Sequence, residues 1–502
     1  MTAPLTTKER NYVIGSALLA LFLGALDALI MSAAMPSIVA ELGGLHLYAW
    51  VYSVYFLSRA VALPIFGKLA DIYHSKYLFL FSIALFLISS IAAGLAQSMS
   101  FLIFCRVFQG IGAGGNFALV YIVLSEVAPL NQRAKTLSLA SSIWGISSVV
   151  GPTLGGFIVS YFSWRWIFFI NIPMGLACLI GIGLFLKESR PKKPNVSIDI
   201  KGLTLFSTFV LGLLIIFITG GRNLPWISGK MAALALFTVL LGVWFYYEEK
   251  RNKEPFIDIN FFKNSGFALG NGATFFSSFT IFAFFAYAPV YIQGGLGLTP
   301  MQVGLAMVSL SLGWSFGSLF LGRFTTGGGG KTGAIAGGLI LLSGSLLTLR
   351  FQIDTTMTEC FIVFLVIGIG MGFVSLSTLI IVQNSVPKED LGVVTSLHQF
   401  GRSLGGTVGV GISGGLVTNG LLNNLEKAID LFPQELVNQL GESVEIILQP
   451  GFSDLIHPEA LAPLRQAVLN GVFSIFWITV ISSFLCLCCC LLLPSNIQNN
   501  EN

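Results

Sequence analysis

Charged side chains are scarce in this chain of 502 residues. Asp, Glu, Lys and Arg make up only 10% of it, whereas hydrophobic residues make up 54%. The mean hydropathy is +0.83. A soluble protein of this length needs far more polar surface to cover its core. The composition therefore excludes a soluble globular protein and places the chain in a lipid bilayer.

Histidine and cysteine are few, and neither forms a recognisable site. The four histidines are scattered without a second ligand at metal spacing, so the sequence predicts no metal centre. His398 is either a histidine at a helix end with no catalytic role or part of a proton path with Arg402. The seven cysteines give no disulfide framework and act as small apolar fillers, with lipidation or metal binding at Cys486–Cys490 as the alternative.

Signals for enzymes and nucleotide cofactors are also missing. Gly327–Gly333 looks like a phosphate-binding loop, but Thr325 stands where its first glycine is required. A membrane-embedded acyl or glycosyl transferase is a remote alternative, because no His–Asp pairing or carboxylate cluster occurs at catalytic spacing. We therefore expect no enzyme, no catalytic residues and no cofactor.

Long apolar runs, in contrast, fill the chain. A helix needs about 20 apolar residues to cross a bilayer, and runs without alternation favour helices over barrel strands. Fourteen runs begin near Tyr12, Tyr48, Tyr77, Phe101, Thr136, Ile167, Lys201, Lys230, Phe267, Met301, Gly333, Glu359, Val393 and Ala467. We expect an all-α integral membrane protein, with the first run kept as a span and not cleaved as a signal peptide.

The runs form two blocks of six that flank a central pair. We expect an N-terminal six-helix bundle in residues 1–186, two extra transmembrane helices with cytoplasmic linkers in 187–266, and a C-terminal six-helix bundle in 267–502. Parallel repeats of this kind place a binding site between two bundles that rock against each other. The acidic outer loop 419–466 is interpreted as a solvated cap, with a docking site for an external partner as the alternative.

Basic residues are concentrated on one side of the predicted membrane. With the N-terminus in the cytoplasm, most of the 27 Lys and Arg fall in cytoplasmic segments, notably 187–201 and 250–263. The positive-inside rule then places both termini in the cytoplasm. The net charge of +4 reflects this topology and an anionic lipid leaflet, and it does not indicate nucleic-acid binding.

Charged residues inside apolar runs are functional candidates, because each costs roughly 2.5 to 3.5 kcal/mol at a helix centre on insertion scales. Asp27 lies in the first run, and Arg106 lies at a similar depth in the fourth. The two side chains could therefore pair. A static ion pair that only holds these two spans together is the alternative interpretation.

The turn between the second and third runs contains GKLADIYHSK, from Gly67 to Lys76. A glycine lets helix ends approach closely, and Asp71 with Lys76 gives a charged clasp that can latch to the opposite bundle and release. We expect a cytoplasmic gate from these three residues together with Glu126 and Arg133.

The fifth run contains WGISSVVGPTLGGF, in which small residues allow close packing and a proline provides a bend. We expect one smooth face formed by Gly145, Gly151, Pro152, Gly155 and Gly156.

These segments, in this order, resemble the major facilitator superfamily, and in particular its fourteen-span drug:proton antiporters. The similar motifs are Leu26–Ile38, Gly67–Lys76, Arg106–Gly110, Gly151–Gly156 and His398–Ile412. The resemblance covers nearly the whole chain.

The resemblance implies a major facilitator fold and a proton-coupled exporter of hydrophobic or amphipathic compounds in a bacterial inner (plasma) membrane. It implies alternating access driven by the proton gradient, with a small amphipathic or lipid-like substrate, protons and membrane lipids as partners. Asp27 is then the candidate proton and substrate carboxylate beside Arg106. Coupling arises because protonation competes with substrate or with the Arg106 contact.

The chain departs from the family pattern in three places. Residues 74–76 replace the usual glycine and basic residues of the loop motif, Ala28 and Leu29 replace polar residues after the aspartate, and Arg59 replaces a small residue. The drier first span and the large outer loop suggest the alternative function, an exporter or flippase of a lipid or lipid-like metabolite.

Arginines outnumber carboxylates in the predicted membrane core, with Arg59, Arg106 and Arg402 against Asp27 alone. If these side chains face a dry central cavity, its field is net positive. We then expect a preference for anionic or zwitterionic amphiphiles over the lipophilic cations usual for the family. The alternative is that Arg59 snorkels or pairs locally with Asp27 and never meets substrate.

Overall fold

The computed structural model describes residues 6–42, 48–129, 132–187, 199–220, 224–298, 300–324, 330–425 and 458–494. Within these ranges the chain is helical apart from turns and one isolated bridge between Gly220 and Leu224. All fourteen predicted run starts lie inside helices. The lack of hydrophobic alternation therefore predicted the secondary structure correctly.

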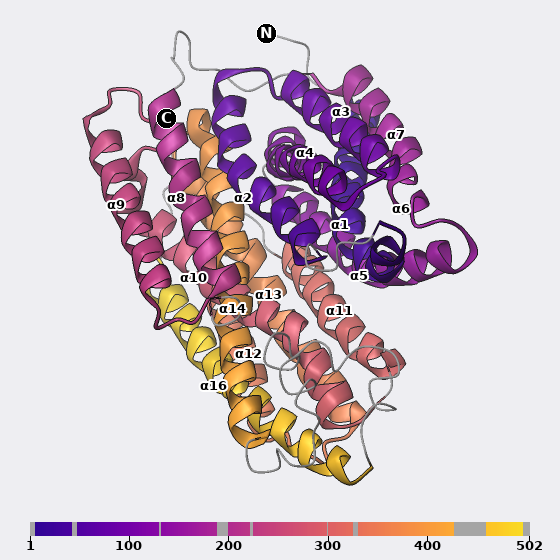
Figure 1. Ribbon diagram of the computed structural model, residues 1–502. Helices are drawn as coiled ribbons and strands as arrows, with labels where there is room; N and C mark the ends of the chain where they lie inside the picture. Colours follow the sequence, from indigo (N-terminus) through magenta and orange to yellow (C-terminus); the bar gives the residue numbers. More distant parts are fainter. Residues whose placement is uncertain are drawn as a thin grey trace.

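The first bundle, drawn from indigo to magenta in Figure 1, contains α1 (Thr7–Leu42), α2 (Tyr48–Ile72), α3 (Ser75–Gly94), α4 (Met99–Val127), α5 (Arg133–Tyr161), α6 (Trp166–Phe169) and α7 (Asn171–Phe185). The sixth predicted run is divided between α6 and α7. The break at Ile170 has a local cause, because Pro173 has no N–H to donate to the carbonyl group of Phe169.

The central pair consists of α8 (Ile200–Thr219) and α9 (Gly229–Arg251), followed by the short helix η3 (Ile259–Lys263). Figure 1 shows the pair on one side of the molecule, where α8 packs against α9, α14 and α2. Only 17% of the α9 span is buried. The pair is therefore central in the sequence and peripheral in the fold.

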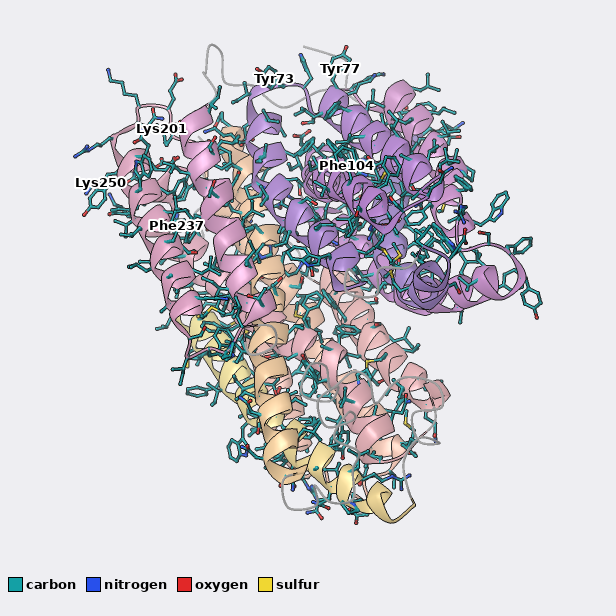
Figure 2. All side chains as sticks on the ribbon, viewed as in Figure 1. Tyr73, Tyr77, Phe104, Lys201, Phe237 and Lys250 are labelled. Atoms are coloured by element: carbon teal, nitrogen blue, oxygen red, sulfur yellow. The ribbon has the colours of Figure 1, made fainter. Side chains whose placement is uncertain are left out.

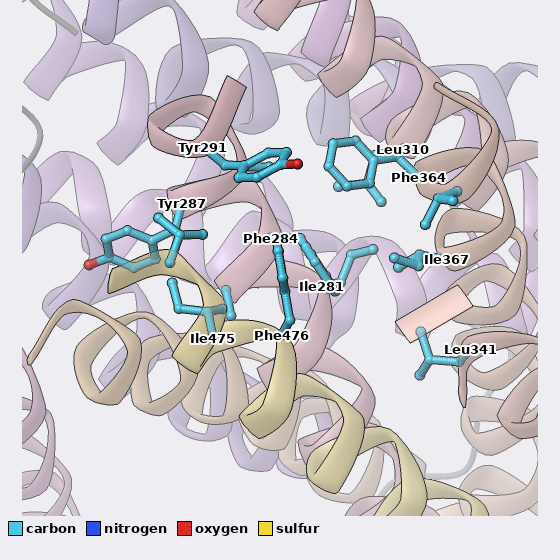
Figure 3. Close-up of a cluster of buried hydrophobic side chains, with 14 of the residues drawn as sticks. Ile281, Phe284, Tyr287, Tyr291, Leu310, Leu341, Phe364, Ile367, Ile475 and Phe476 are labelled. Carbon is cyan, nitrogen blue, oxygen red and sulfur yellow. The ribbon is translucent and has the colours of Figure 1, made fainter. Parts of the chain in front are cut away.

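The second bundle contains α10 (Ser265–Pro289), the π-helical segment η4 (Val290–Gly295), α11 (Pro300–Phe324), α12 (Gly330–Thr348), α13 (Met357–Asn384), the short η5 (Lys388–Asp390), α14 (Leu391–Leu425) and α16 (Pro458–Leu492). Its core is a cluster of buried aliphatic and aromatic side chains (Figure 3). Tyr291 stacks on Phe351 at 5.5 Å between ring centroids, and Phe284 lies 6.2 Å from Phe476. This cluster joins η4 and α16 to the bundle.

Twelve of the described helices are long and apolar enough to cross a membrane by length and composition. The two remaining long helices, α5 and α14, have 29 and 35 residues. Large apolar side chains cover the outside of the molecule, including Phe104 and Phe237, which are 58% and 55% exposed (Figure 2). An apolar exterior of this kind fits contact with lipid chains, and the protein is a multi-pass membrane protein.

Candidate functional site

Asp27 on α1 is buried, with 2% of its surface exposed, and lies in a network between helices of the first bundle. Its Oδ2 atom is 2.7 Å from Nη1 of Arg106 on α4. Its Oδ1 atom accepts hydrogen bonds from Gln109 at 2.8 Å and from Asn171 at 3.2 Å. Gln109 also accepts a bond from Arg106 at 2.9 Å. The predicted pairing of Asp27 with Arg106 is therefore confirmed.

A second set of contacts holds the network in place. The Arg106 guanidinium lies 4.0 Å above the Tyr55 ring, and Asn171 donates to Ser90 at 3.0 Å. The close approach of α2 to α4 depends on Gly110, where a Cβ atom would meet the Tyr55 carbonyl at 2.5 Å. The ionised Asp27 thus has an arginine and two amides as partners, each a charge-assisted bond worth about 1.5 to 3 kcal/mol.

Sequence reasoning missed Gln109 and Asn171. Gln109 follows Arg106 by three residues and so shares its helix face, which is a usable signal. Asn171 is an isolated polar residue in an apolar run, and only the folded packing of α7 against α1 brings it to Asp27.

Hydrogen bonds hold the two bundles together at one end of the molecule, which we call the closed end. It comprises the turn between α2 and α3, the end of α4, the start of α5, the end of α13 and the start of α14. Here the buried Asp71 accepts backbone bonds from Gly392 at 2.8 Å and Val393 at 2.7 Å, in the first turn of α14. Gly67 lies close to Ser396, and a Cβ atom on it would meet the Gly392 carbonyl at 2.7 Å. A carboxylate at a helix N-terminus is favourable because it pairs with open N–H groups and with the helix dipole.

A second contact at the closed end joins four helices. Arg133, at the start of α5, donates to Gln383 at 2.8 Å and to Asn384 at 3.4 Å, both at the end of α13. Gln383 donates in turn to Ser125 on α4 at 3.0 Å and to Thr395 on α14 at 2.9 Å. Gln383 therefore links both bundles, although its sequence context gave no indication of this role.

The other two predicted gate residues lie near these contacts. Lys76 is in the first turn of α3 and Glu126 is in the last turn of α4, and both are half-buried. The structure thus places all five predicted gate residues at the closed end.

The predicted small residues of the fifth run lie on α5: Gly145, Gly151, Pro152, Gly155 and Gly156. The glycines among them do not all share one face. Gly145 packs against Ser315 of α11 across the bundle interface, Gly151 packs against Leu29 of α1 at 2.8 Å, and Gly156 has open space around it. The reason is geometric, because Gly151 follows Gly145 by six positions, which do not complete two helical turns. α5 therefore contacts α1 beside Asp27 and α11 in the opposite bundle.

Arg59 on α2 is buried and lies against aromatic rings. Its Cζ atom is 4.4 Å from the centroid of Phe117 and 5.6 Å from that of Trp144. The partners of Asp27 among the described residues are Arg106, Gln109 and Asn171 and do not include Arg59. Local pairing of Arg59 with Asp27, which was one part of the alternative interpretation of this residue, is therefore wrong.

Arg402 on α14 reaches the same aromatic group from the opposite bundle. Its Cζ atom is 5.3 Å from the Phe117 centroid and 5.8 Å from that of Trp314. It donates to the Tyr121 hydroxyl at 3.4 Å and to Ser375 Oγ at 3.5 Å. The structure thus brings together Arg59 and Arg402, and neither of them forms an ion pair with Asp27.

His398 lies about two turns inside α14 and is not at a helix end. It is fully buried, and its Nε2 atom is 2.8 Å from Thr274 and 3.1 Å from Thr378. Across the ranges that the structure describes, no group of three His, Cys, Asp or Glu side chains could hold a metal ion. Most of the predicted outer loop 419–466 lies outside the described residues.

Two helical bundles that close on each other at one end, with charged side chains buried within and between them, define a multi-pass membrane transporter. The chain belongs to the Major Facilitator Superfamily, which residues 17–410 match. Its members are transporters, so the chain is not an enzyme.

Known relatives agree with this assignment. The chain is 32% identical over 486 residues to Multidrug transporter protein MdtP of Bacillus subtilis (strain 168), covering 95% of this chain and 89% of that protein. It is 28% identical over 481 residues to Multidrug resistance protein 3 of the same organism, covering 95% and 94%. The fold is similar to that of the human organic anion transporter MFSD10 (TETRAN), with a TM-score of 0.62, 13% identity, and coverage of 95% of this chain and 99% of that one.

Proposed function

We propose that this chain is a proton-coupled antiporter that exports hydrophobic or amphipathic compounds from the cytoplasm. We place it in the fourteen-span subfamily, because α5 and α14 are long enough to span a bilayer at 1.5 Å per residue. Relatives named for multidrug transport support export. The excess of Lys and Arg in the predicted cytoplasmic segments supports cytoplasmic termini in an inner (plasma) membrane, and the bacterial relatives support a bacterial host.

The Asp27 network is the observation that carries the proposal. Asp27 is buried between three helices, and a proton on its carboxyl group removes the negative charge and so weakens the contact with Arg106. Two residues further along α1, Leu29 packs on Gly151 of α5, and α5 packs on α11 of the opposite bundle. Protonation of Asp27 would therefore loosen α1 against α4 and α7 and shift α5 at the bundle interface.

The closed end supplies the second element of alternating access. Asp71 and Gln383 hold the bundles together there through hydrogen bonds that do not involve the Asp27 network. Opening at this end requires these bonds to break, which admits substrate from the side that we assign to the cytoplasm. Release at the other side follows when the closed end forms again.

The test is transport into liposomes that contain the purified chain and an acidic lumen. We would measure uptake of radiolabelled dodecylsulfonate and dodecyltrimethylammonium, which share one apolar chain and differ in permanent charge. We expect gradient-driven uptake of at least one probe by the native chain and none by Asp27→Asn, because an amide cannot carry a proton.

Asp354→Asn is the matched control, since Asp354 is an exposed carboxylate far from the network in the sequence. It should transport normally, and both variants should elute as single folded species. Full gradient-driven uptake by Asp27→Asn would end the assignment of Asp27.

A further inference from the structure

Two arginines from opposite bundles lie against one aromatic ring. Arg59 of α2 and Arg402 of α14 have their Cζ atoms 4.4 Å and 5.3 Å from the centroid of Phe117. These distances keep the two Cζ atoms within about 10 Å of each other. Both residues are buried, with 8% and 5% of their surface exposed. Two like charges are thus held close together where water screens them poorly.

No acidic partner compensates these charges within the described part of the chain. Neither arginine takes part in an ion pair with a described residue. Arg402 has long bonds to two neutral hydroxyl groups, and both guanidinium groups rest on aromatic faces. Cation–π contacts offset only part of the cost of burying a cation, so the pair is short of negative charge.

Residues close to the same pair carry buried hydrogen-bond donors without a partner in the described part of the chain. The Nε1 atoms of Trp144 and Trp314 are buried and have no hydrogen-bond partner among the described residues, and the same holds for the side-chain amide of Gln399. The Trp144 ring lies 5.6 Å from Arg59, and the Trp314 ring lies 5.8 Å from Arg402. Gln399 precedes Arg402 by about one turn of α14. Buried donors are normally satisfied in native proteins, so this group points to a ligand rich in acceptor atoms.

We propose that Arg59 and Arg402 form the anion-binding subsite of the transport pathway, and that the substrates are amphipathic anions. This inference rests on the proposed export function and specifies its substrate class. A sulfonate, phosphate or carboxylate head group sits between the two guanidinium groups and accepts from the indole N–H groups. The apolar part of the substrate lies on the rings of Phe117, Trp144 and Trp314.

The two arginines belong to different bundles, so an anion bound between them affects how the bundles are arranged. Arg59 belongs to the first bundle and Arg402 to the second, so an anion that contacts both brings α2 and α14 together. Substrate therefore binds most tightly to the arrangement in which both guanidinium groups reach it, and it shifts the bundles toward that arrangement.

The test is equilibrium binding without a proton gradient, using the full chain in nanodiscs of zwitterionic lipid. The probes are radiolabelled dodecylsulfonate and dodecyltrimethylammonium. We expect the native chain to bind the sulfonate more tightly. Arg59→Gln and Arg402→Gln should each weaken sulfonate binding by about tenfold or more, because each removes a charge-assisted contact, with ammonium binding unchanged or improved.

Two controls keep the result interpretable. Arg59→Lys keeps the charge and should retain part of the sulfonate affinity, whereas Arg350→Gln removes an exposed arginine and should change nothing. Equal affinity of the native chain for both probes would overturn the inference, even if a variant failed to fold. An equal effect of Arg59→Gln and Arg402→Gln on both probes, or no effect, would also overturn it.

Failure of this inference is distinguishable from failure of the proposed function. Binding is measured at equilibrium, whereas export is measured under a proton gradient. A chain that binds the sulfonate through the arginine pair but shows no gradient-driven uptake keeps the subsite and loses the antiport mechanism. Gradient-driven uptake of the ammonium probe without sulfonate binding keeps the antiport mechanism and loses the anion-binding subsite.

Discussion

Asp27 and Arg106 are separated by 79 residues in the sequence, yet their side chains meet at 2.7 Å with 2% and 1% of their surface exposed. A buried ion pair contributes little net stability, because desolvation opposes the Coulomb attraction. Removal of one partner, in contrast, leaves an uncompensated charge in a dry site. A reversible change of charge on this pair should therefore change the packing of the helices around it.

Loss of Arg106 should destabilise the fold more than loss of the whole pair. Arg106→Gln leaves the Asp27 carboxylate buried without its cation, at a cost of about 3 to 5 kcal/mol. The double variant Asp27→Asn/Arg106→Gln should regain much of this loss. Melting temperatures of the purified variants decide it: a double variant less stable than Arg106→Gln would show that the network is not held together by charge.

Asp71→Asn should shift the chain toward the state in which the contacts between the bundles at the closed end are broken. The amide loses the charge that favours Asp71 at the α14 N-terminus, and it can accept both backbone bonds only with its single oxygen. We expect slower transport. We also expect an increase of about tenfold in the thiol labelling of Val394→Cys, measured in a cysteine-free background, because Val394 is fully buried next to the Asp71 contact with α14.

Labelling at Thr407→Cys, about four turns further along α14 and away from the closed end, serves as the second reporter and should change in the opposite direction. Unchanged accessibility at both positions would rule out a gating role for Asp71.

Gly67→Ala should act at the same place by steric means. The new methyl group would meet the Ser396 side chain and lie 2.7 Å from the Gly392 carbonyl, so the helices must move apart. Transport should slow, and Val394→Cys should label faster. Gly304→Ala is the control, since a Cβ atom there has nothing within 4 Å. If both alanine variants transport equally well, the close contact at Gly67 is not needed.

A pH-dependent contact lies at the far end of the first bundle from Asp71. Hydrogen bonds from Arg165 at 2.7 Å and from Trp164 at 2.7 Å hold the pKa of Glu41 below its ordinary value. Because the folded pKa is lowered, this stabilisation is present above the ordinary carboxyl pKa and is lost as pH falls through the lowered one.

Glu41→Gln should therefore lower the melting temperature at neutral pH, and the difference from the native chain should shrink in acid. Asp354→Asn, an exposed carboxylate without such partners, should show no such trend. A difference that stays constant with pH would mean that the contact does not depend on charge.

Much of the fold could be predicted, because the bilayer imposes long apolar helices that are visible as runs. The pairing of Asp27 with Arg106 was also predictable, since two opposite charges at equal depth in apolar helices have few other partners. The break at Ile170 and the peripheral position of α8 and α9 were not predicted, because they depend on local proline geometry and on packing between distant segments.

The partners of the gate could not be predicted for a different reason. Asp71 binds two backbone N–H groups at the start of α14, and backbone groups leave no mark in the sequence. Gln383 is one polar residue among many near helix ends, and only the folded chain shows that it contacts both bundles.

Proton release on substrate binding tests the central claim most directly. The purified chain is placed in weakly buffered solution with a pH-sensitive dye, and dodecylsulfonate or dodecyltrimethylammonium is added; neither probe titrates. If Asp27 exchanges a proton for substrate, the native chain releases protons on binding, and Asp27→Asn binds without release. Proton release that persists in Asp27→Asn would contradict the account, as would binding by the native chain without release at any pH.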